Sequence, residues 1–174
     1  MARVEELEAL GLGPLGPGSE LDEEAQALLA LAAETYEAER RALALLARAE
    51  QSAFMLRSKL MARGFDARSI RSALSRLGSL GLLDDRRFAT AYASSRLARR
   101  SEGPASLRAA LQAHGIDGEL AREVVGSLFS GEARAELLAR AFGRELRRSG
   151  GDAAAARDRL RRLGYSAGEV ADCG

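Results

Sequence analysis

The chain has 174 residues, 47% of them hydrophobic and 29% charged, which is ordinary for a soluble globular protein and enough to build a core without disulfides or a structural metal. One cysteine, Cys173, and one histidine, His114, exclude a disulfide framework, an ordinary zinc site and a multi-histidine metal centre. The net charge of +1 hides a segregation: residues 1–56 carry net −7, residues 57–100 net +8, and residues 101–174 net 0.

The N-terminal part of the chain carries no targeting or membrane signal. No basic segment precedes an apolar run there, and no stretch approaches about 18 apolar residues, so we expect a cytoplasmic protein with no membrane contact. Residues 1–18 are interpreted as a short segment ending in a flexible Gly/Pro linker, GLGPLGPG. Ser19, with Asp22 three residues later, resembles a capping box and predicts a helical run rich in Ala, Leu and Glu to about Glu50.

One pattern recurs three times after this run: LMARGFD around Gly64, LQAHGID around Gly115 and LRRLGYS around Gly164. The glycines are 51 and 49 residues apart, which predicts three supersecondary repeats. In each copy the glycine is expected to stop a helix in a left-handed conformation, with the next apolar residue folding back on the leucine five positions earlier. The Asp or Ser that follows is expected to cap the next helix.

Apolar stripes at helical spacing flank these turns. They consist of Ala53, Leu56 and Leu60, then Ile70, Leu74 and Leu77, then Leu107, Leu111 and His114, then Leu120, Val124 and Leu128. Longer leading helices are expected at roughly 34–49, 84–100 and 132–148, and no segment alternates with the period of a strand. We therefore predict an all-α fold of tandem three-helix repeats, helix-turn-helix-like, elongated and curved, with about nine helices. The predicted boundaries are an N-terminal helix plus repeat 1 at 19–83, repeat 2 at 84–130 and repeat 3 at 131–174.

No group of residues predicts catalysis or cofactor binding. Asp84 and Asp85 fit either a metal or acid–base pair, or a helix cap followed by a first-turn acid. We favour the cap, because no third carboxylate or histidine lies nearby in sequence. His114 is expected to bond free carbonyls at a helix end. Because the chain also lacks a nucleophile elbow and a phosphate-binding loop, we predict that it is not an enzyme and takes no metal, cofactor or small-molecule substrate.

The turns also resemble a helix-turn-helix, whose second helix enters the major groove of DNA. After the first turn that helix offers Arg68, Arg71 and Arg76, whereas the corresponding helices of the other two copies are acidic or mixed. This pattern argues against repeated base readout. The helix of the first copy could still contact phosphates. That interpretation predicts weak, salt-dependent binding to single- or double-stranded DNA.

Residues 60–65 (LMARGF) and 81–89 (GLLDDRRFA), followed by Tyr92, Arg96, the pair GP at 103–104 and LQAHGI at 111–116, resemble the signature of the RecX regulatory proteins. The resemblance covers about residues 21–165. Arg63, His114 and Leu163 stand where the family usually has a lysine before the turn glycine, and Met55 replaces a common acidic residue. The resemblance implies tandem three-helix repeats that bind RecA, lie along the groove of its nucleoprotein filament, and inhibit its recombinase, ATPase and coprotease activities. Such proteins modulate DNA repair, recombination and the SOS response.

The basic block supplies a candidate surface for such a filament, because a filament on DNA presents acidic protein and phosphate, and arginine pairs with both. We expect the surface to consist of Arg57, Lys59, Arg63, Arg68, Arg71, Arg96, Arg99 and Arg100. Two alternatives stay open: a DNA-binding repeat protein that acts through phosphate contacts independent of RecA, and a helical adaptor with solvated arginines. The acidic first third either contacts a partner or folds back on the basic block.

Overall fold

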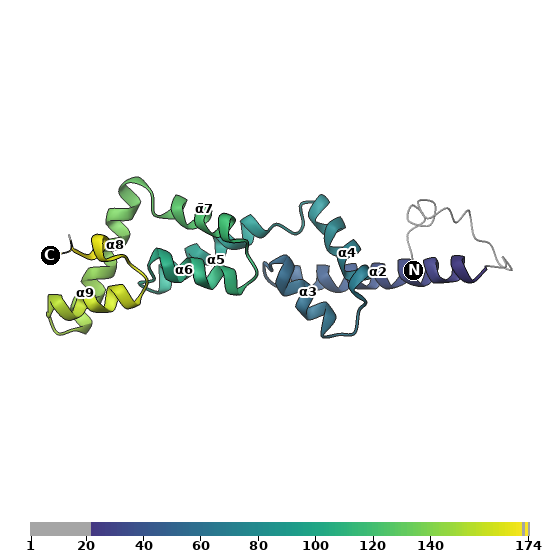
Figure 1. The fold of residues 1–174 in the computed structure, drawn as a ribbon, viewed down its shortest axis with the longest axis horizontal. Helices are drawn as coiled ribbons and strands as arrows, with labels where there is room; N and C mark the ends of the chain where they lie inside the picture. Colours follow the sequence, from purple (N-terminus) through teal and green to yellow (C-terminus); the bar gives the residue numbers. More distant parts are fainter. Residues whose placement is uncertain (1–21, 172, 174) are drawn as a thin grey trace. The chain divides into compact units, whose positions relative to one another are not determined.

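A computed structural model of the chain describes residues 22–171 and 173, and every regular element in this range is a helix (Figure 1). The chain divides into two compact units, one ending at Asp84 and the other beginning at Asp85. The first unit contains α2 (Glu23–Leu46), α3 (Ala53–Met61) and α4 (Ala67–Ser79). The second contains α5 (Asp85–Arg99), α6 (Pro104–Ala113), α7 (Gly118–Leu128), α8 (Gly131–Arg148), α9 (Ala153–Arg162) and α10 (Ala167–Ala171). Three sets of three helices in the described range confirm the predicted all-α repeat fold.

The first described helix begins later than the sequence predicts. Asp22 is the N-cap of α2, and its carboxylate accepts a hydrogen bond of 2.8 Å from the backbone N–H of Ala25. The predicted cap, Ser19, and the predicted segment and linker at residues 1–18 lie outside the described residues. At its other end α2 stops at Leu46, short of the predicted Glu50, and Ser52 then caps α3.

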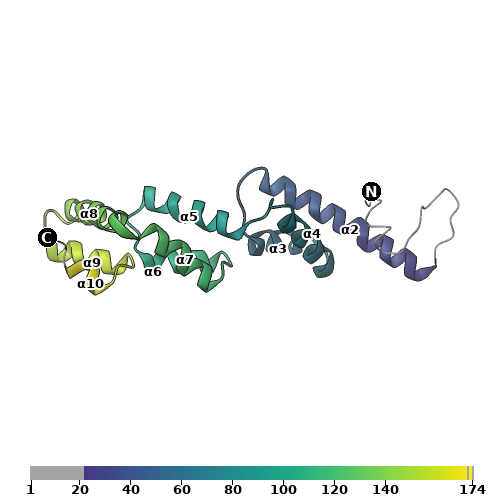
Figure 2. The ribbon, with the colours of Figure 1, turned by 90° about the horizontal axis from the view of Figure 1, so that it is seen from above.

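The core of the first unit is built from the predicted apolar stripes. Leu56 and Leu60 of α3 meet Ile70 and Leu77 of α4, and all four are almost completely buried. Helix α2 packs against both α3 and α4, as the two views in Figures 1 and 2 show. Because burying a side chain of this size stabilises a fold by about 1.5–3 kcal/mol, these four residues are a major part of what holds the unit together.

Within the described range, the acidic first third of the chain folds back on the basic block. The carboxylate of Glu34 in α2 accepts a hydrogen bond of 2.6 Å from the backbone N–H of Asp66, at the start of α4. The buried carboxylate of Glu39, also in α2, lies 3.6 Å from the guanidinium of Arg76 in α4. The sequence left open whether the acidic segment contacts a partner or folds back on the basic block. These two carboxylates of α2 do the latter.

The same turn joins the second helix to the third in each set. Gly64, Gly115 and Gly164 have φ angles of 86°, 78° and 95°, in the left-handed region that glycine adopts without strain. The residue after each glycine donates its N–H to the carbonyl of the leucine five positions earlier, which is the hydrogen bond that closes a Schellman motif. The donor–acceptor pairs are Phe65–Leu60 at 3.3 Å, Ile116–Leu111 at 3.1 Å and Tyr165–Leu160 at 3.2 Å.

The residue that follows each turn caps the next helix. Asp66 accepts hydrogen bonds from two backbone N–H groups at the start of α4, and Asp117 does the same for α7. Ser166 and Glu169 form a reciprocal capping box at the start of α10. The backbone N–H groups stabilise the carboxylate form, so they lower the pKa of Asp66 and of Asp117 from the ordinary value.

These caps predict a loss of stability in acid. A carboxyl group whose pKa is lower in the folded than in the unfolded state stabilises the fold above its unfolded pKa, and this contribution disappears as the pH falls through the folded pKa. We therefore expect the Tm to drop as the pH falls below about 4. The variant with both Asp66→Asn and Asp117→Asn keeps an acceptor at each cap but has no proton to take up there, so its Tm should fall less over the same range. Thermal melts by circular dichroism at stepped pH measure this, and equal drops in the two proteins would contradict it.

A close backbone approach joins the second and third sets of helices inside the second unit. The N–H of Gly103 donates to the carbonyl of Leu163 at 2.7 Å, and the N–H of Ala105 donates to the carbonyl of Gly164 at 3.1 Å. A Cβ atom added at Gly103 would lie 2.5 Å from the carbonyl carbon of Gly164. Next to this contact, burial raises the pKa of Tyr165 to about 12. The start of α6 and the end of α9 are therefore held together by main-chain hydrogen bonds that need glycine at both positions.

Candidate functional site

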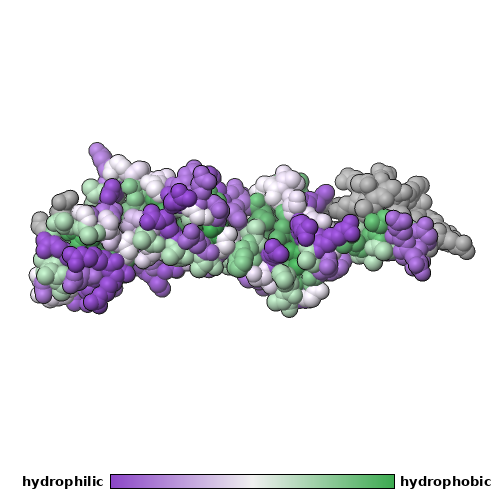
Figure 3. Space-filling view, viewed as in Figure 1, coloured by the Kyte–Doolittle hydropathy of each residue, from purple (hydrophilic) through white to green (hydrophobic). Residues whose placement is uncertain are grey.

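Helices α3 and α4 carry four of the eight predicted contact residues, and a fifth, Arg63, lies in the turn between them. Polar and apolar surface adjoin over these helices in Figure 3. Arg68 and Arg71 lie on the first two turns of α4 and are exposed, whereas Ile70 between them is buried. Across residues 22–171 and 173, neither guanidinium takes part in a hydrogen bond or an ion pair with the protein. Both cations are therefore available to an anionic partner.

The three predicted contact residues of α3 and its end differ in how they are used. Arg57 is exposed, and no hydrogen bond or ion pair within the described part of the chain engages its guanidinium. Lys59 is half-buried and donates from Nζ to Oε1 of Gln51 at 2.5 Å. Arg63 is exposed but donates from Nη1 to the backbone carbonyl of Lys59 at 2.8 Å. Of the three, Arg57 is thus the one whose charged group is open to a partner. The ammonium group of Lys59 is already bonded to Gln51, just before the start of α3.

Arg96 in the second unit has an internal role, which differs from its predicted place on a partner-binding surface. Its guanidinium donates to both carboxylate oxygens of the buried Glu102, at 2.7 and 2.5 Å, and to the hydroxyl of Tyr92 at 2.6 Å. The hydrogen bonds to Glu102 raise the pKa of Arg96 above its ordinary value. Arg99 and Arg100 remain exposed at the C-terminal end of α5, with Arg100 lying 3.5 Å from the same Glu102.

The carboxylate pair of the basic block lies at the start of a helix. Helix α5 begins at Asp85, so Asp84 directly precedes its first residue and Asp85 is the acid of its first turn. His114 is the C-cap of α6, and its ring packs edge-on against Phe88 and Tyr92 of α5. Among the described residues, no group of three or more His, Cys, Asp or Glu side chains is placed to hold a metal ion.

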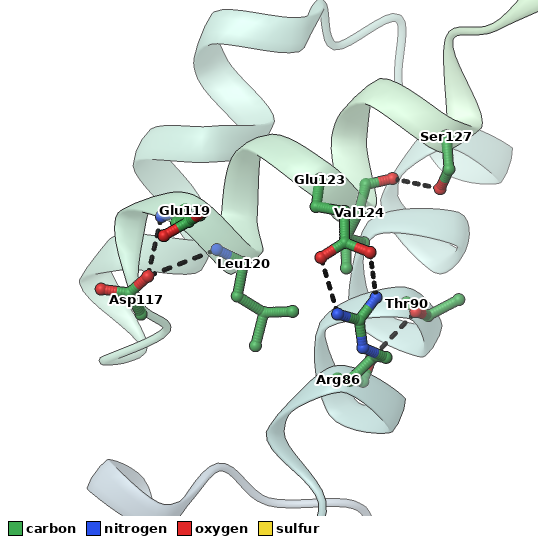
Figure 4. A network of polar contacts seen from close by, with 8 residues as sticks. All are labelled: Arg86, Thr90, Asp117, Glu119, Leu120, Glu123, Val124 and Ser127. Atoms are coloured by element: carbon green, nitrogen blue, oxygen red, sulfur yellow. Dashed lines mark hydrogen bonds and ion pairs between the residues drawn. The ribbon is translucent and has the colours of Figure 1, made fainter.

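An ion pair that the sequence did not indicate joins α5 to α7. The guanidinium of Arg86 donates to both carboxylate oxygens of Glu123 at 2.6 Å (Figure 4). The hydrogen bond from Arg86 lowers the pKa of Glu123, but both side chains are more than half exposed, and water screens such a pair. Two carboxylates of α7, Glu119 and Glu123, share this surface with Asp117 (Figure 4). Helix α7 also carries the exposed Arg122, and Glu123 is paired with Arg86, so the second helix-turn-helix copy presents a helix of mixed charge where the first presents arginines.

No helix in residues 22–171 has both the length and the apolar character needed to cross a membrane. The fold and the candidate surface together define a protein of tandem three-helix repeats whose first unit presents a cationic helix pair. Residues 38–77 match the family model described as the first three-helix domain of RecX, and residues 84–125 match the model of its second three-helix domain. The chain belongs to the RecX family of regulatory proteins.

Curated relatives and solved structures agree with this assignment. The chain is 46% identical over 84 residues to the regulatory protein RecX of Thermus thermophilus, a match that spans 48% of this chain and 57% of that protein. It is 39% identical over 108 residues to the RecX protein of Xanthomonas axonopodis pv. citri, spanning 60% of this chain and 65% of that protein. The chain thus spans about three fifths of the length of these curated relatives.

Solved structures share the fold at lower identity. A crystal structure described as regulatory protein RecX superposes with a TM-score of 0.80 at 23% identity, covering 97% of this chain and 85% of that one. RecX from Lactobacillus salivarius superposes with a TM-score of 0.72 at 19% identity, covering 80% of this chain and 94% of that one. At this level of identity the likeness establishes the fold of the repeats.

Proposed function

We propose that this protein is a non-enzymatic regulator that binds RecA or its nucleoprotein filament in the cytoplasm and inhibits the recombinase, ATPase and coprotease activities of RecA. Through that inhibition it modulates DNA repair, recombination and the SOS response. Membership of a regulatory family supports the proposal at the level of the whole chain. The single observation that carries it at the level of residues is the set of exposed, unengaged guanidinium groups on α3 and α4 in the described structure.

Charge explains why this surface suits a filament. Residues 53–79 contain six cations and one carboxylate, that of Asp66, which is already bonded to the start of α4. A filament of protein on DNA offers carboxylates and phosphates, and an arginine guanidinium pairs with either through two parallel hydrogen bonds. We place the contact on Arg57, Arg68 and Arg71 of the first unit, with Arg63 and Lys59 adding positive charge there. Arg99 and Arg100 stay predicted contact residues of the second unit. Arg96 is omitted because Glu102 and Tyr92 occupy its guanidinium.

The alternative is a protein that binds DNA phosphates independently of RecA. The observation that favours it is the place of Arg68 and Arg71 at the start of α4, the second helix of a helix-turn-helix. The mixed charge of α7, which carries Glu119 and Glu123 beside Arg122, argues against a repeated use of this geometry along DNA.

Co-sedimentation with RecA filaments, beside a salt titration on bare single-stranded DNA of the same length, separates the two functions. Each phosphate contact adds about 0.7 to the salt slope on single strands, so binding through phosphate alone should weaken steeply with salt. The proposed function predicts binding to the filament that persists at salt concentrations where bare DNA is released. Equal, equally salt-sensitive binding to both would favour the alternative, and binding to neither would leave a helical adaptor.

A further inference from the structure

Four large apolar side chains are left exposed in the described residues, and all four lie in the first unit. Phe54 is 53% exposed, Met61 52%, Leu80 55% and Leu82 44%. Apolar surface is correspondingly visible over α3 and α4 in Figure 3. Single exposed apolar residues need no explanation, but several on one small unit mark a surface for another macromolecule.

Two of them share one face of α3 with an available cation. Phe54, Arg57, Ser58 and Met61 follow the spacing i, i+3, i+4 and i+7, and all four are exposed. We call these four residues the α3 outer face. Leu56 and Leu60, on the opposite face, are fully buried in the core. Because the core is already complete without Phe54 and Met61, their exposure does not follow from the packing of this unit.

The positive charge around the α3 outer face indicates what kind of partner binds there. Arg57 lies between Phe54 and Met61, and the surrounding segment 53–79 is strongly basic. A DNA backbone would satisfy the arginine but leave both apolar side chains in water, and one aromatic ring makes a poor platform for stacked bases. A second copy placed face to face would bring the two Arg57 side chains together. A protein segment that carries both carboxylates and apolar side chains satisfies all of these groups.

We propose that the α3 outer face docks an acidic amphipathic helix of a protein partner. Phe54 and Met61 are seven residues apart, or about 10 Å along the helix axis, which matches two turns of a partner helix with apolar residues at the same spacing. Its apolar side chains cover Phe54 and Met61, and a carboxylate pairs with Arg57. The inference rests on the proposed function, since Arg57 belongs to that surface, and it specifies that protein rather than DNA occupies this part of it.

The test uses a synthetic, fluorescently labelled helical peptide of about 18 residues with leucine along one face and glutamate elsewhere, and a second peptide with glutamine in place of glutamate. We expect the full chain to bind the acidic peptide in fluorescence anisotropy and to prefer it over the glutamine peptide. Phe54→Ser with Met61→Ser should weaken binding by at least about tenfold, because both side chains lose apolar burial in the complex. Arg57→Gln should abolish the preference for glutamate. The matched control, Leu80→Ser with Leu82→Ser, removes similarly exposed side chains outside α3 and should bind within about twofold of the unchanged chain.

Several outcomes would overturn the inference. They are an unchanged chain that does not bind the acidic peptide, equal binding of both peptides, or equal loss of binding in the control variant. A dimer in sedimentation equilibrium that Phe54→Ser with Met61→Ser dissociates would assign the face to a second copy instead. The assay contains neither RecA nor DNA. Failure here with intact inhibition of RecA would therefore remove the docked helix alone, and loss of the proposed function would appear only in the filament assays.

Discussion

Reversing the charge of Arg68 and Arg71 together, as Arg68→Glu with Arg71→Glu, is expected to weaken inhibition of the RecA ATPase by at least about tenfold, or 1.4 kcal/mol of binding free energy. Both guanidinium groups are exposed on the first turns of α4, and within the described range neither is engaged by the protein. The variant replaces two attractive contacts with an anionic filament by two repulsive ones. Titrating each protein into an ATPase assay at fixed RecA and DNA measures the change.

The Tm of this variant should stay close to that of the unchanged chain, because exposed substitutions away from the core usually change stability by less than about 0.5 kcal/mol. Arg41→Glu with Arg48→Glu is the matched control: it makes the same change in net charge on exposed arginines of the same unit, in and just after α2. We expect the control to inhibit normally. Unchanged inhibition by the α4 variant would show that α4 is not part of the contact surface. Equal losses of inhibition in the two variants would show that only the net charge of the protein matters.

The largest expected effect on stability is at the contact between Gly103 and Gly164. Gly103→Ala should lower the free energy of unfolding by about 1–3 kcal/mol, because the new Cβ overlaps the backbone of Gly164. The φ angle of Gly103 is −87°, which alanine adopts freely, so the loss measures the overlap alone. Gly164→Ala adds a left-handed φ of 95°, costing about 1–2 kcal/mol more, and a second overlap at 2.5 Å with the backbone nitrogen of Ser106.

Gly64→Ala is the control for that comparison. Its φ of 86° is also left-handed, but nothing lies within 4 Å of the added Cβ, so the cost should be only the about 1–2 kcal/mol of backbone strain. Urea unfolding by far-ultraviolet circular dichroism gives the free energies, and hydrogen exchange of α6 and α9 assigns the loss to the second unit. Full stability of Gly103→Ala would mean that the two backbones do not approach this closely.

The turns were predictable because their determinants are local. A glycine, the apolar residue after it and the following Asp or Ser specify a helix stop and a helix start within seven residues, and the pattern recurs at Gly64, Gly115 and Gly164. The buried stripes at Leu56, Leu60 and Ile70 were equally readable, because helical spacing assigns them to one side. Residues that act through distant partners gave no such signal.

The roles of the cations depended on which carboxylates the fold brings to them, six residues away for Arg96 and 37 for Arg86. Arg96 looks like any other arginine of the basic block until the fold brings Glu102 beneath its guanidinium, and Arg86 meets Glu123 across 37 residues of sequence. The approach of Gly103 to Gly164 depends likewise on how two repeats pack. The α3 outer face was missed for another reason: Phe54 and Met61 are as apolar as core residues, so the sequence alone does not show that they lie outside the core.

Electron cryo-microscopy of the chain bound to a RecA filament shows which helices meet the filament. We predict density for the first unit against the filament, with Arg57, Arg68 and Arg71 at the contact. Filaments with no bound chain, or a chain held only through the second unit, would contradict it.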